Sequence, residues 1–579
     1  SSMDLQPLYS WATVSNSGQL LGTFAVGNVD ADPALEIVVN SRDGIHVYKY
    51  DGTLVSTFNT AVGSVARPVN APPTLVDING NGRAEIIFAT AHPTAGDPAV
   101  TNSVFAIDGE DGSVIWEMPI TRATYSSPDS GYQTIAGKFY YDGAEHNQLP
   151  SQSTLTANVS AIPVFDIDGD GRLEAVVTLK IRPEPVQDYN PYINDIWGFG
   201  EFGLVGESWS GGNFILKADT GERDYIYHAL QLCEAGTALG VVDAAQGVAV
   251  FMLADSDSIM GYHKTAPHGF FGAGNLIGQF GKNSRIQSGS YKRPVILNAV
   301  DLTGNGKAEV LYTGRNIADL LWQGSRVIFD HHGRILWRKW YDFPETVDQT
   351  NHWYNAAQMI PVNLDSGNPE ILTWHHTNQL FYEEWDGVEL VSKSGQWPVS
   401  FGNEFPSPPA IGDVDGDGVE EFVVGRYDPT DLNAGGGVTV LNQDSSVKYS
   451  IDTPRGIKNV PNLYDVEQNG VLNIIVRDLA GTIYIYGTEG GDPERVSWAT
   501  EYRTAARTGA LGMWLYDERA PILDTTVEGY RRVELSWNVA AATGLNGFEI
   551  YRRQYTDADF ALIATLQANA RTFADTGLD

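Results

Sequence analysis

Short apolar runs separated by glycine and aspartate recur along most of the chain. Residues 36–39, 86–88 and 422–424 are runs of this kind, and the first of them is followed by a second apolar run that ends at the turn Asp51-Gly52. Runs of this length, rich in β-branched and aromatic residues and bounded by turn residues, predict strands joined in tight hairpins. We therefore expect an all-β protein made of antiparallel four-stranded units.

An acidic loop of nine residues connects many of these runs. Its clearest form is Asp166-Ile-Asp-Gly-Asp-Gly-Arg-Leu-Glu174, with oxygen-bearing side chains at the first, third, fifth and ninth positions and glycines that let the backbone curl. Calcium takes about six to eight oxygen ligands in flexible geometry, so we expect about five Ca²⁺ sites in the loops that keep this spacing. Their candidate metal ligands are Asn28, Asp30, Asp32, Glu36, Asp77, Asn79, Asn81, Glu85, Asp166, Asp168, Asp170, Glu174, Asp301, Thr303, Asn305, Glu309, Asp413, Asp415, Asp417 and Glu421.

Two further copies of the loop deviate from this pattern. Residues 363–370 are one residue short, and residues 465–473 end in the neutral Asn473, so we expect no metal in either. An alternative for the whole set is that the carboxylates only cap turns by accepting hydrogen bonds from backbone N–H groups.

The spacing of the loops predicts the fold. The loops start at residues 28, 77, 166, 301, 363, 413 and 465, and a period of about 50 residues with four strands per repeat is typical of a β-propeller. The longer gap after residue 166 contains residues 237–262, which keep the strand pattern without the acids. We expect an eight-bladed β-propeller, with seven blades as the alternative if this stretch is only an insertion.

The strand–loop–strand unit resembles the FG-GAP or VCBS repeat of integrin α-chain propellers and of many secreted bacterial proteins, over about residues 20–490. This resemblance implies calcium in the five regular loops. Residues 498–509 are similar to the segment that follows such propellers in bacterial exported proteins. We expect a propeller domain over residues 21–515, with residues 1–20 closing it or packing on it.

The last 60 residues have a different character. Residues 532–538 alternate apolar and polar positions, and residues 547–552 form a second such strand. Residues 520–579 look like the first half of a fibronectin type III module, with Trp537 and Tyr551 at the positions of its core aromatics. Because this β-sandwich needs about seven strands, we expect the module to be incomplete and the natural chain to continue beyond residue 579.

Charge and composition limit the classes of molecule that this protein is expected to bind. The chain has 579 residues and a net charge of −35, which argues against nucleic acid and anionic membranes, although acidic surfaces also simply confer solubility. No run of 18 apolar residues exists, so no membrane insertion is expected. The first residues do not have the features of a signal peptide. We expect that a signal peptide either was removed or was never part of this sequence. A secreted or cell-surface protein fits, and since Cys233 is the one cysteine, calcium would replace disulfides as the rigid element.

Four insertions exceed the turns that blades need, namely residues 119–158, 181–212, 257–293 and 342–357. Loops on a rigid scaffold commonly carry binding and catalytic residues. The second insertion is rich in aromatic residues that could stack on sugar rings, although they could equally pack the insertion onto the blades. Its candidate ligand-binding residues are Tyr189, Tyr192, Trp197 and Trp209.

The third insertion holds the main basic cluster, which is unexpected in so acidic a chain. A polysaccharide lyase needs basic groups to neutralise a uronate carboxylate and a Tyr or His to abstract a proton. Propeller lyases acting on acidic polysaccharides have a similar general plan. The candidate catalytic residues are Tyr262, His263, His268, Lys282, Arg285, Tyr291 and Arg293. The alternative is that the basic residues form salt bridges with acidic neighbours.

These observations lead to three possible functions. The first is an exported calcium-stabilised propeller that binds a glycan or an extracellular protein. The second is a lyase acting on a uronate-containing polysaccharide, and the third is a structural component of a surface assembly. The oligomeric state stays open.

Overall fold

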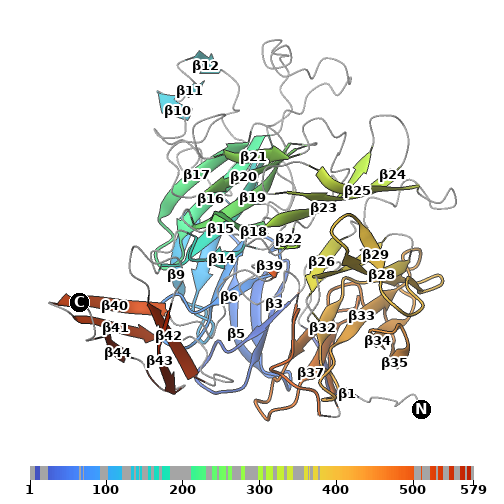
Figure 1. Ribbon diagram of the computed structural model, residues 1–579. Helices are drawn as coiled ribbons and strands as arrows, with labels where there is room; N and C mark the ends of the chain where they lie inside the picture. Colours follow the sequence, from blue (N-terminus) through green and yellow to red (C-terminus); the bar gives the residue numbers. More distant parts are fainter. Residues whose placement is uncertain are drawn as a thin grey trace.

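A ring of antiparallel β-sheets forms the body of the protein, which is therefore an all-β propeller (Figure 1). The computed structural model describes residues 7–13, 24–63, 67–69, 71–90, 102–119, 132–135, 138–141, 144–146, 154–157, 162–167, 172–182, 210–229, 238–243, 247–255, 258–263, 276–280, 298–303, 308–316, 323–330, 335–342, 358–362, 364, 369–375, 378–488, 490–500, 510–511, 522–529, 532–538, 547–552, 561–567, 570 and 572–575.

Seven blades are each built from consecutive strands of the chain. Blade 1 contains β2 (Ala25–Gly27), β3 (Glu36–Asn40), β4 (Gly44–Tyr48) and β5 (Leu54–Asn59). Blade 2 contains β6 (Thr74–Val76), β7 (Glu85–Ala89), β8 (Ser103–Ile107) and β9 (Val114–Pro119). Blade 3 contains β13 (Thr154–Ala157), β14 (Val164–Phe165), β15 (Glu174–Arg182), β16 (Ser210–Lys217) and β17 (Arg223–Ala229).

The next four blades follow in chain order. Blade 4 contains β18 (Ala238–Asp243), β19 (Gly247–Asp255), β20 (Ser258–His263) and β21 (Leu276–Phe280). Blade 5 contains β22 (Asn298–Val300), β23 (Glu309–Asn316), β24 (Gln323–Phe329) and β25 (Ile335–Asp342). Blade 6 contains β26 (Gln358–Val362), β27 (Glu370–His375), β28 (Gln379–Trp385), β29 (Leu390–Ser392) and β30 (Val399–Ser400). Blade 7 contains β31 (Phe405–Pro406), β32 (Ala410–Gly412), β33 (Glu421–Tyr427), β34 (Gly436–Leu441) and β35 (Val447–Thr453).

An eighth four-stranded sheet, called here the closing blade, joins the two ends of the ring. It contains β36 (Asn462–Tyr464), β37 (Asn473–Arg477), β38 (Thr482–Gly487) and, as its outer strand, β1 (Pro7–Ala12). Trp11 and Ala12 of β1 pair with Ile483 and Thr482 of β38. The segment that begins the propeller therefore completes its last sheet.

The residues inside the blades explain their packing. In blade 1 every residue of β3 and β4 is buried, whereas the outer strand β5 has only exposed and half-buried residues. Apolar side chains such as Ile37 and Val39 pack against Ile475 and Ile485 of the closing blade. Middle strands are apolar on both faces because a neighbouring blade covers each face.

The chain after the last blade runs along the inner strands of the ring. The backbones of Trp498 and Ile411 exchange hydrogen bonds of 2.9 and 3.1 Å, and the N–H of Leu463 donates to Ala499 at 2.9 Å. Further on, β39 (Ala510–Leu511) pairs in parallel with β22 in the middle of the ring (Figure 1). The Trp498 side chain is 1% exposed and packs with residues of blades 6 and 7. We call residues 490–511 the central segment.

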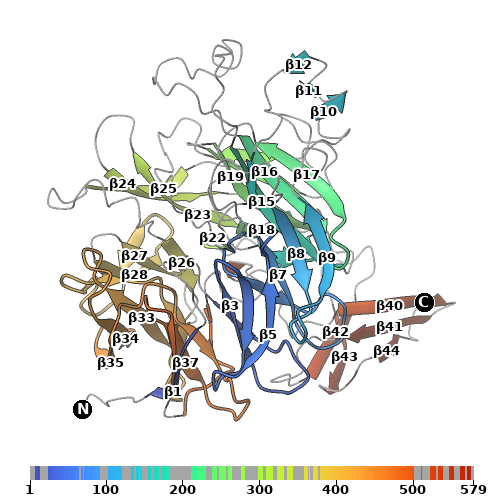
Figure 2. The same ribbon diagram turned by 180° about the vertical axis from the view of Figure 1, so that it is seen from behind.

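Two groups of strands lie outside the ring. The sheet of β10 (Tyr132–Ile135), β11 (Lys138–Tyr141) and β12 (Ala144–His146) lies beyond one end of blade 3 (Figures 1 and 2). The C-terminal residues form a three-stranded sheet of β40 (Ile522–Gly529), β41 (Arg532–Asn538) and β44 (Thr572–Asp575) and a pair of β42 (Gly547–Arg552) and β43 (Ala561–Gln567). Phe548 packs with Phe573, so the two small sheets are in contact. The side chains of Trp537 and Tyr551 lie outside the described residues.

Replacing Trp498 with alanine should destabilise the propeller by about 3–5 kcal/mol, because it opens a large cavity where the central segment packs against the blades. Chemical denaturation measures this loss. Val388→Ala, at a position that is 74% exposed, is the control and should change stability by less than about 0.5 kcal/mol. Equal effects of the two substitutions would contradict the role given to the central segment.

Candidate cation sites

One hydrogen bond recurs in all the acidic loops that the structure describes. The N–H of the second loop residue donates to a side-chain oxygen of the closing residue, and the closing glutamates are at most 2% exposed. The bonds run from Val29 to Glu36 (3.0 Å), Ile78 to Glu85 (2.8 Å), Ile167 to Glu174 (2.8 Å), Leu302 to Glu309 (2.8 Å) and Val414 to Glu421 (3.0 Å). One oxygen of each closing glutamate is thus committed to the loop backbone.

The two deviating loops keep this bond. Leu364 donates to Glu370 at 3.1 Å across the shortened loop, and Val466 donates to the side-chain oxygen of Asn473 at 3.1 Å. A neutral amide oxygen therefore replaces the carboxylate in the last loop. The closing residue shapes the loop whether or not the other acids are present.

The first aspartate of the loop also binds backbone groups. Asp413 accepts hydrogen bonds from Gly416 at 2.7 Å and from Gly418 at 2.8 Å. Both glycines have positive φ angles, 75° and 87°, which side chains disfavour. Asp413 thus caps the turn, as the alternative reading expects, and Asp415 and Asp417 each also accept a backbone N–H two residues further on, at 3.3 and 2.8 Å.

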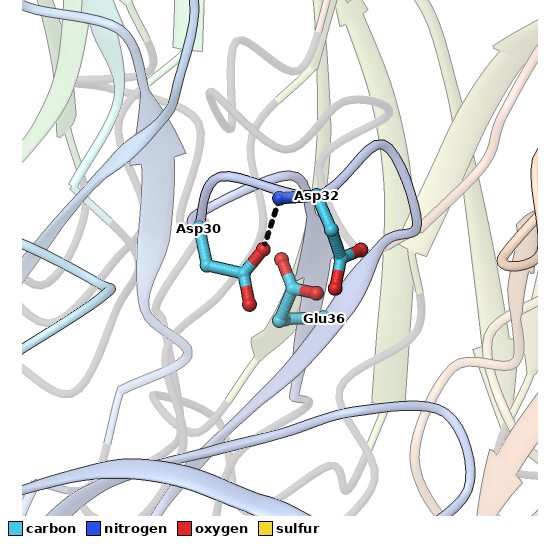
Figure 3. Close-up of side chains that lie close together, drawn as sticks. All are labelled: Asp30, Asp32 and Glu36. Carbon is cyan, nitrogen blue, oxygen red and sulfur yellow. Dashed lines mark hydrogen bonds between the residues drawn. The ribbon is translucent and has the colours of Figure 1, made fainter.

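Two loops bring three carboxylates together. One oxygen each from Asp30, Asp32 and Glu36 lies within 4.8 Å of the others, and the same holds for Asp413, Asp415 and Glu421. Figure 3 shows Asp30, Asp32 and Glu36 converging from the loop and the start of β3. Two oxygens bound to one Ca²⁺ at about 2.4 Å are at most about 4.8 Å apart, so the spacing fits a shared ion.

An unpaired atom in the first loop supports this fit. Glu36 is fully buried, and its Oε1 has no hydrogen-bond partner, while Oε2 accepts the N–H of Val29. A buried carboxylate oxygen without a partner is costly. A cation bound beside Asp30 and Asp32 would satisfy it. We call these two groups the Asp30 triad and the Asp413 triad.

A lysine reaches each triad from the neighbouring hairpin. Lys49, directly after β4, contacts Asp32 and lies 3.7 Å from Asp30. Lys448 in β35 contacts Asp415 and lies 2.9 Å from Glu421 and 3.6 Å from Asp417. Our sequence analysis missed both lysines. The hairpin register is the signal that could have found them, because it places the third and fourth strands beside the loop.

Loop 77–85 meets the same need with amides. The Nδ2 group of Asn79 donates to Oε1 of Glu85 at 2.5 Å, and that of Asn81 donates to it at 3.5 Å. Asp77 accepts the N–H groups of Gly80 and Gly82, each at 2.7 Å. In this arrangement Asn79 and Asn81 offer donors to the glutamate, so both amides would have to rotate before their oxygens could bind a cation.

The remaining candidate ligands are only partly described. Asp168, Asp170 and Asn305 lie outside the described residues, and Thr303 is exposed at the surface. Asp166 and Asp301 open their loops as the sequence predicts. Asn28 has a buried Oδ1 without a hydrogen-bond partner at the start of the first loop, and Asp417 lies at the rim of the Asp413 triad.

Burial changes the protonation of the closing glutamates. The pKa values of Glu36, Glu85, Glu309 and Glu421 are raised to about 7, first because burial disfavours the charged carboxylate. Neighbouring aspartates, such as Asp30 beside Glu36 and Asp415 beside Glu421, raise the pKa values further. A bound cation favours the charged form and opposes this shift.

The strand order separates the acidic loops from the insertions. In an antiparallel blade, the first-to-second and third-to-fourth connections leave one end of the sheet, called here the cation face. Connections from second to third strand and from blade to blade leave the opposite end, called here the insertion face. The segments after β9, β15, β21 and β25 therefore all emerge on the insertion face.

The structure changes the boundaries of the third insertion. Strands β20 and β21 of blade 4 lie within residues 257–293, which the sequence analysis assigned to an insertion. Tyr262 pairs with Leu276 at one end of the hairpin, and Ile259 pairs with Phe280 at the other. β21 therefore ends at the opposite end of the hairpin from Tyr262 and His263. These two strands were assigned to an insertion because the repeat of blade 4 lacks the acidic residues that mark the other blades.

Most of the other candidate residues lie outside the described residues. These are Tyr189, Tyr192, Trp197 and Trp209 among the aromatic candidates and His268, Lys282, Arg285, Tyr291 and Arg293 among the catalytic candidates. Of the described strands that precede them in the sequence, β15 and β21 end at the insertion face, and β20 ends at the cation face.

Comparisons with known proteins give only structural likenesses. No protein-family model and no curated protein match the sequence. The exotype rhamnogalacturonan lyase YesX is similar over 84% of this chain and 76% of its own, with 13% identity and a TM-score of 0.45. The Vibrio cholerae biofilm matrix protein Bap1 is similar over 80% and 96%, with 13% identity and a TM-score of 0.33. BamB from Moraxella catarrhalis is similar over 83% and 99%, with 10% identity and a TM-score of 0.32.

Values this low leave the function to be argued from the residues of this chain. Within the described residues, no helix has the length and apolar character needed to cross a membrane.

Without metal, the protein should become less stable as the pH rises from 4.5 to 7. A glutamate with a pKa raised from 4.5 to about 7 keeps a proton in the folded state that the unfolded chain has lost in this window. Between pH 4.5 and 7 the folded state therefore binds more protons than the unfolded chain, so the free energy of unfolding is highest near pH 4.5. Thermal melting in chelator at several pH values measures the trend.

Two variants test the assignment of this trend. Glu421→Gln should flatten it in part, and Glu222→Gln, at a side chain that is 71% exposed, should leave it unchanged. Added calcium should weaken the trend because it favours the charged carboxylates. A chelated protein that gains stability between pH 4.5 and 7 would show that the closing glutamates are not the controlling groups.

Proposed function

We propose that this protein is an exported, calcium-stabilised propeller that binds a glycan or an extracellular protein through the insertions of its insertion face. The observation that carries the proposal is the separation of two faces by strand order. Acidic loops occupy one end of the blades, while the strands that precede four long segments, β9, β15, β21 and β25, end at the other. The β20–β21 connection is on the side of the acidic loops. A scaffold stabilised at one face can present recognition loops at the opposite one.

The calcium part of the proposal rests on the chemistry of the loops. Both triads consist of oxygen ligands alone, which suits a hard cation and not a soft transition metal. The buried Oε1 of Glu36 is left for such an ion. The resemblance of the repeats to FG-GAP or VCBS units supports calcium in about five loops and a secreted or cell-surface location, with a fibronectin type III-like module after the propeller.

The glycan part of the proposal rests on which residues share a face. Tyr189, Tyr192, Trp197 and Trp209 follow β15 in the sequence, residues 281–297 follow β21, and both strands end at the insertion face. Aromatic rings offer stacking surfaces to sugars, and the basic residues of the second segment suit an acidic one. The two sequence features are therefore parts of one surface in this proposal.

A polysaccharide lyase is the second candidate, favoured by the same observation. Lys282, Arg285, Tyr291 and Arg293 belong to the stretch of sequence that follows β21, and under this alternative they would together hold a uronate and abstract its proton. Tyr262 leads away toward the cation face. Under this alternative, Tyr291 becomes the stronger candidate for the base.

Calcium should raise the melting temperature, and chelator should lower it. An ion that binds only the folded state stabilises by about 2.7 kcal/mol at one hundred times its Kd. Asp415→Asn should reduce the calcium-dependent part of this shift. Asp444→Asn, at an exposed turn of the same blade, is the control. A melting temperature that is the same in calcium and in chelator would refute the calcium assignment.

Replacing residues 183–209 with a short turn should abolish glycan binding while the calcium-dependent melting shift remains. Glycan-array binding and titration of acidic and neutral oligosaccharides measure the loss, with Val388→Ala on the cation face as control. Ultraviolet absorbance of unsaturated uronate products tests the lyase in the same samples. Cleavage that is lost in Tyr291→Phe would favour the lyase, and intact binding after the replacement would refute the insertion face as the site.

A further inference from the structure

We propose that Lys49 and Lys448 are built-in counter-cations of the two triads, which compete with a divalent ion for the same oxygens and keep the ring closed without it. The inference rests on the proposed function, since it concerns the regulation of the same cation loops. It assigns a role to two residues outside the acidic motif.

The contacts of Lys448 are those expected of a bound cation. Its ammonium group contacts Asp415, lies 2.9 Å from Glu421 and lies 3.6 Å from Asp417. These are the third, ninth and fifth loop positions, which the repeat offers to a metal. Only 15% of the lysine side chain is exposed, so the group is held inside the loop and not at its rim.

Lys49 makes the equivalent contacts in blade 1. It contacts Asp32 and lies 3.7 Å from Asp30, at the fifth and third loop positions. Its side chain is 35% exposed, and Oε1 of Glu36 has no hydrogen bond. The Asp30 triad is therefore neutralised less completely than the Asp413 triad.

The two lysines come from different places in their blades. In blade 1, Tyr48 pairs with Leu54 at the hairpin, so Lys49 follows the third strand. In blade 7, Leu441 pairs with Val447, so Lys448 lies in the fourth strand. At the matching positions blade 7 has Asn442 and blade 1 has Val55. One cationic position is thus filled by two unrelated routes, which points to a requirement for positive charge there.

Blade 2 shows the arrangement without a lysine. Ile107 pairs with Val114, so the matching positions hold Asp108 and Ile115. The amide of Asn79 is the donor that reaches Glu85 in this loop. A divalent ion entering loop 77–85 would rotate amides, whereas one entering the two triads must displace an ammonium group.

The two triads that carry a lysine lie on both sides of the closing blade. A third lysine, Lys393, reaches the closing Glu370 of the blade 6 loop at 3.4 Å. The N–H of Leu35 in the first loop donates to Val466 in the loop of the closing blade at 3.0 Å. Asp413 exchanges backbone hydrogen bonds with Arg495 and Asp492 of the central segment, at 2.8 and 2.9 Å. The closing blade itself has the neutral Asn473 in its loop. The seam of the ring therefore carries its own positive charges.

An ammonium group on a flexible stem can leave when a divalent ion arrives. Removing it should have opposite effects in the two states of the loop. Without metal, the triad loses the ammonium group that neutralises it, and the protein loses stability. With calcium, the competitor is gone and the ion binds more tightly.

The test compares Lys49→Met and Lys448→Met with Lys217→Met, whose lysine pairs with a single exposed glutamate at 3.5 Å. All proteins are purified in calcium, where the variants should fold, and are then exchanged into chelator. Titration calorimetry measures calcium affinity, and thermal melting in chelator measures the metal-free state. We expect calcium to bind about tenfold tighter to Lys448→Met, with a smaller gain for Lys49→Met.

In chelator, Lys448→Met, the variant expected to bind calcium most tightly, should have the lowest melting temperature. Lys217→Met should melt like the wild type. Lys448→Arg keeps the charge and should restore most of the metal-free melting temperature. If the wild type binds calcium and both methionine variants bind it equally well, the competition is refuted while the proposed calcium scaffold stands. If no protein binds calcium, both proposals fail. An unchanged melting temperature of both variants in chelator would refute the counter-cation role.

Discussion

One hydrogen bond is common to every described acidic loop. The second residue of the loop donates its N–H to the closing side chain, as in Val29 to Glu36 and Val414 to Glu421. The bond places a carboxylate in the interior of the sheet, where it needs either a proton, a donor or a cation. The charge balance of the blades, the raised pKa values of the closing glutamates and the recruitment of lysines all follow from this buried group.

The loops satisfy this need in different ways. Asn79 supplies an amide donor to Glu85, Lys448 supplies a positive charge to Glu421, and Asn473 removes the need by being neutral. The acids of one motif therefore have divided roles. The first and ninth residues organise the backbone, whereas the third and fifth residues accept backbone N–H groups and also approach a lysine, as Asp415 and Asp417 do with Lys448.

Much of the frame could be predicted from the sequence, because the loop motif and the β-branched runs are local signals. Blade 4 was harder to delimit, since without acids the strands β20 and β21 resembled part of an insertion. The triads were partly predictable from the spacing of Asp413, Asp415 and Glu421. Lys448 was not, because its contacts arise from strand pairing across a hairpin and not from any spacing within the loop.

The closure of the ring has a consequence for the order of folding. Trp11 of β1 can pair with Ile483 of β38 only after β38 has been synthesised, more than four hundred residues later in the chain. The central segment follows later still, since residues 490–511 come after every blade that they touch. Contacts this distant in sequence are slow to form because a long loop must close first. Until then the first sheet lacks one neighbour, so the nascent chain exposes apolar side chains such as Ile37 and Val39 that only the completed ring buries.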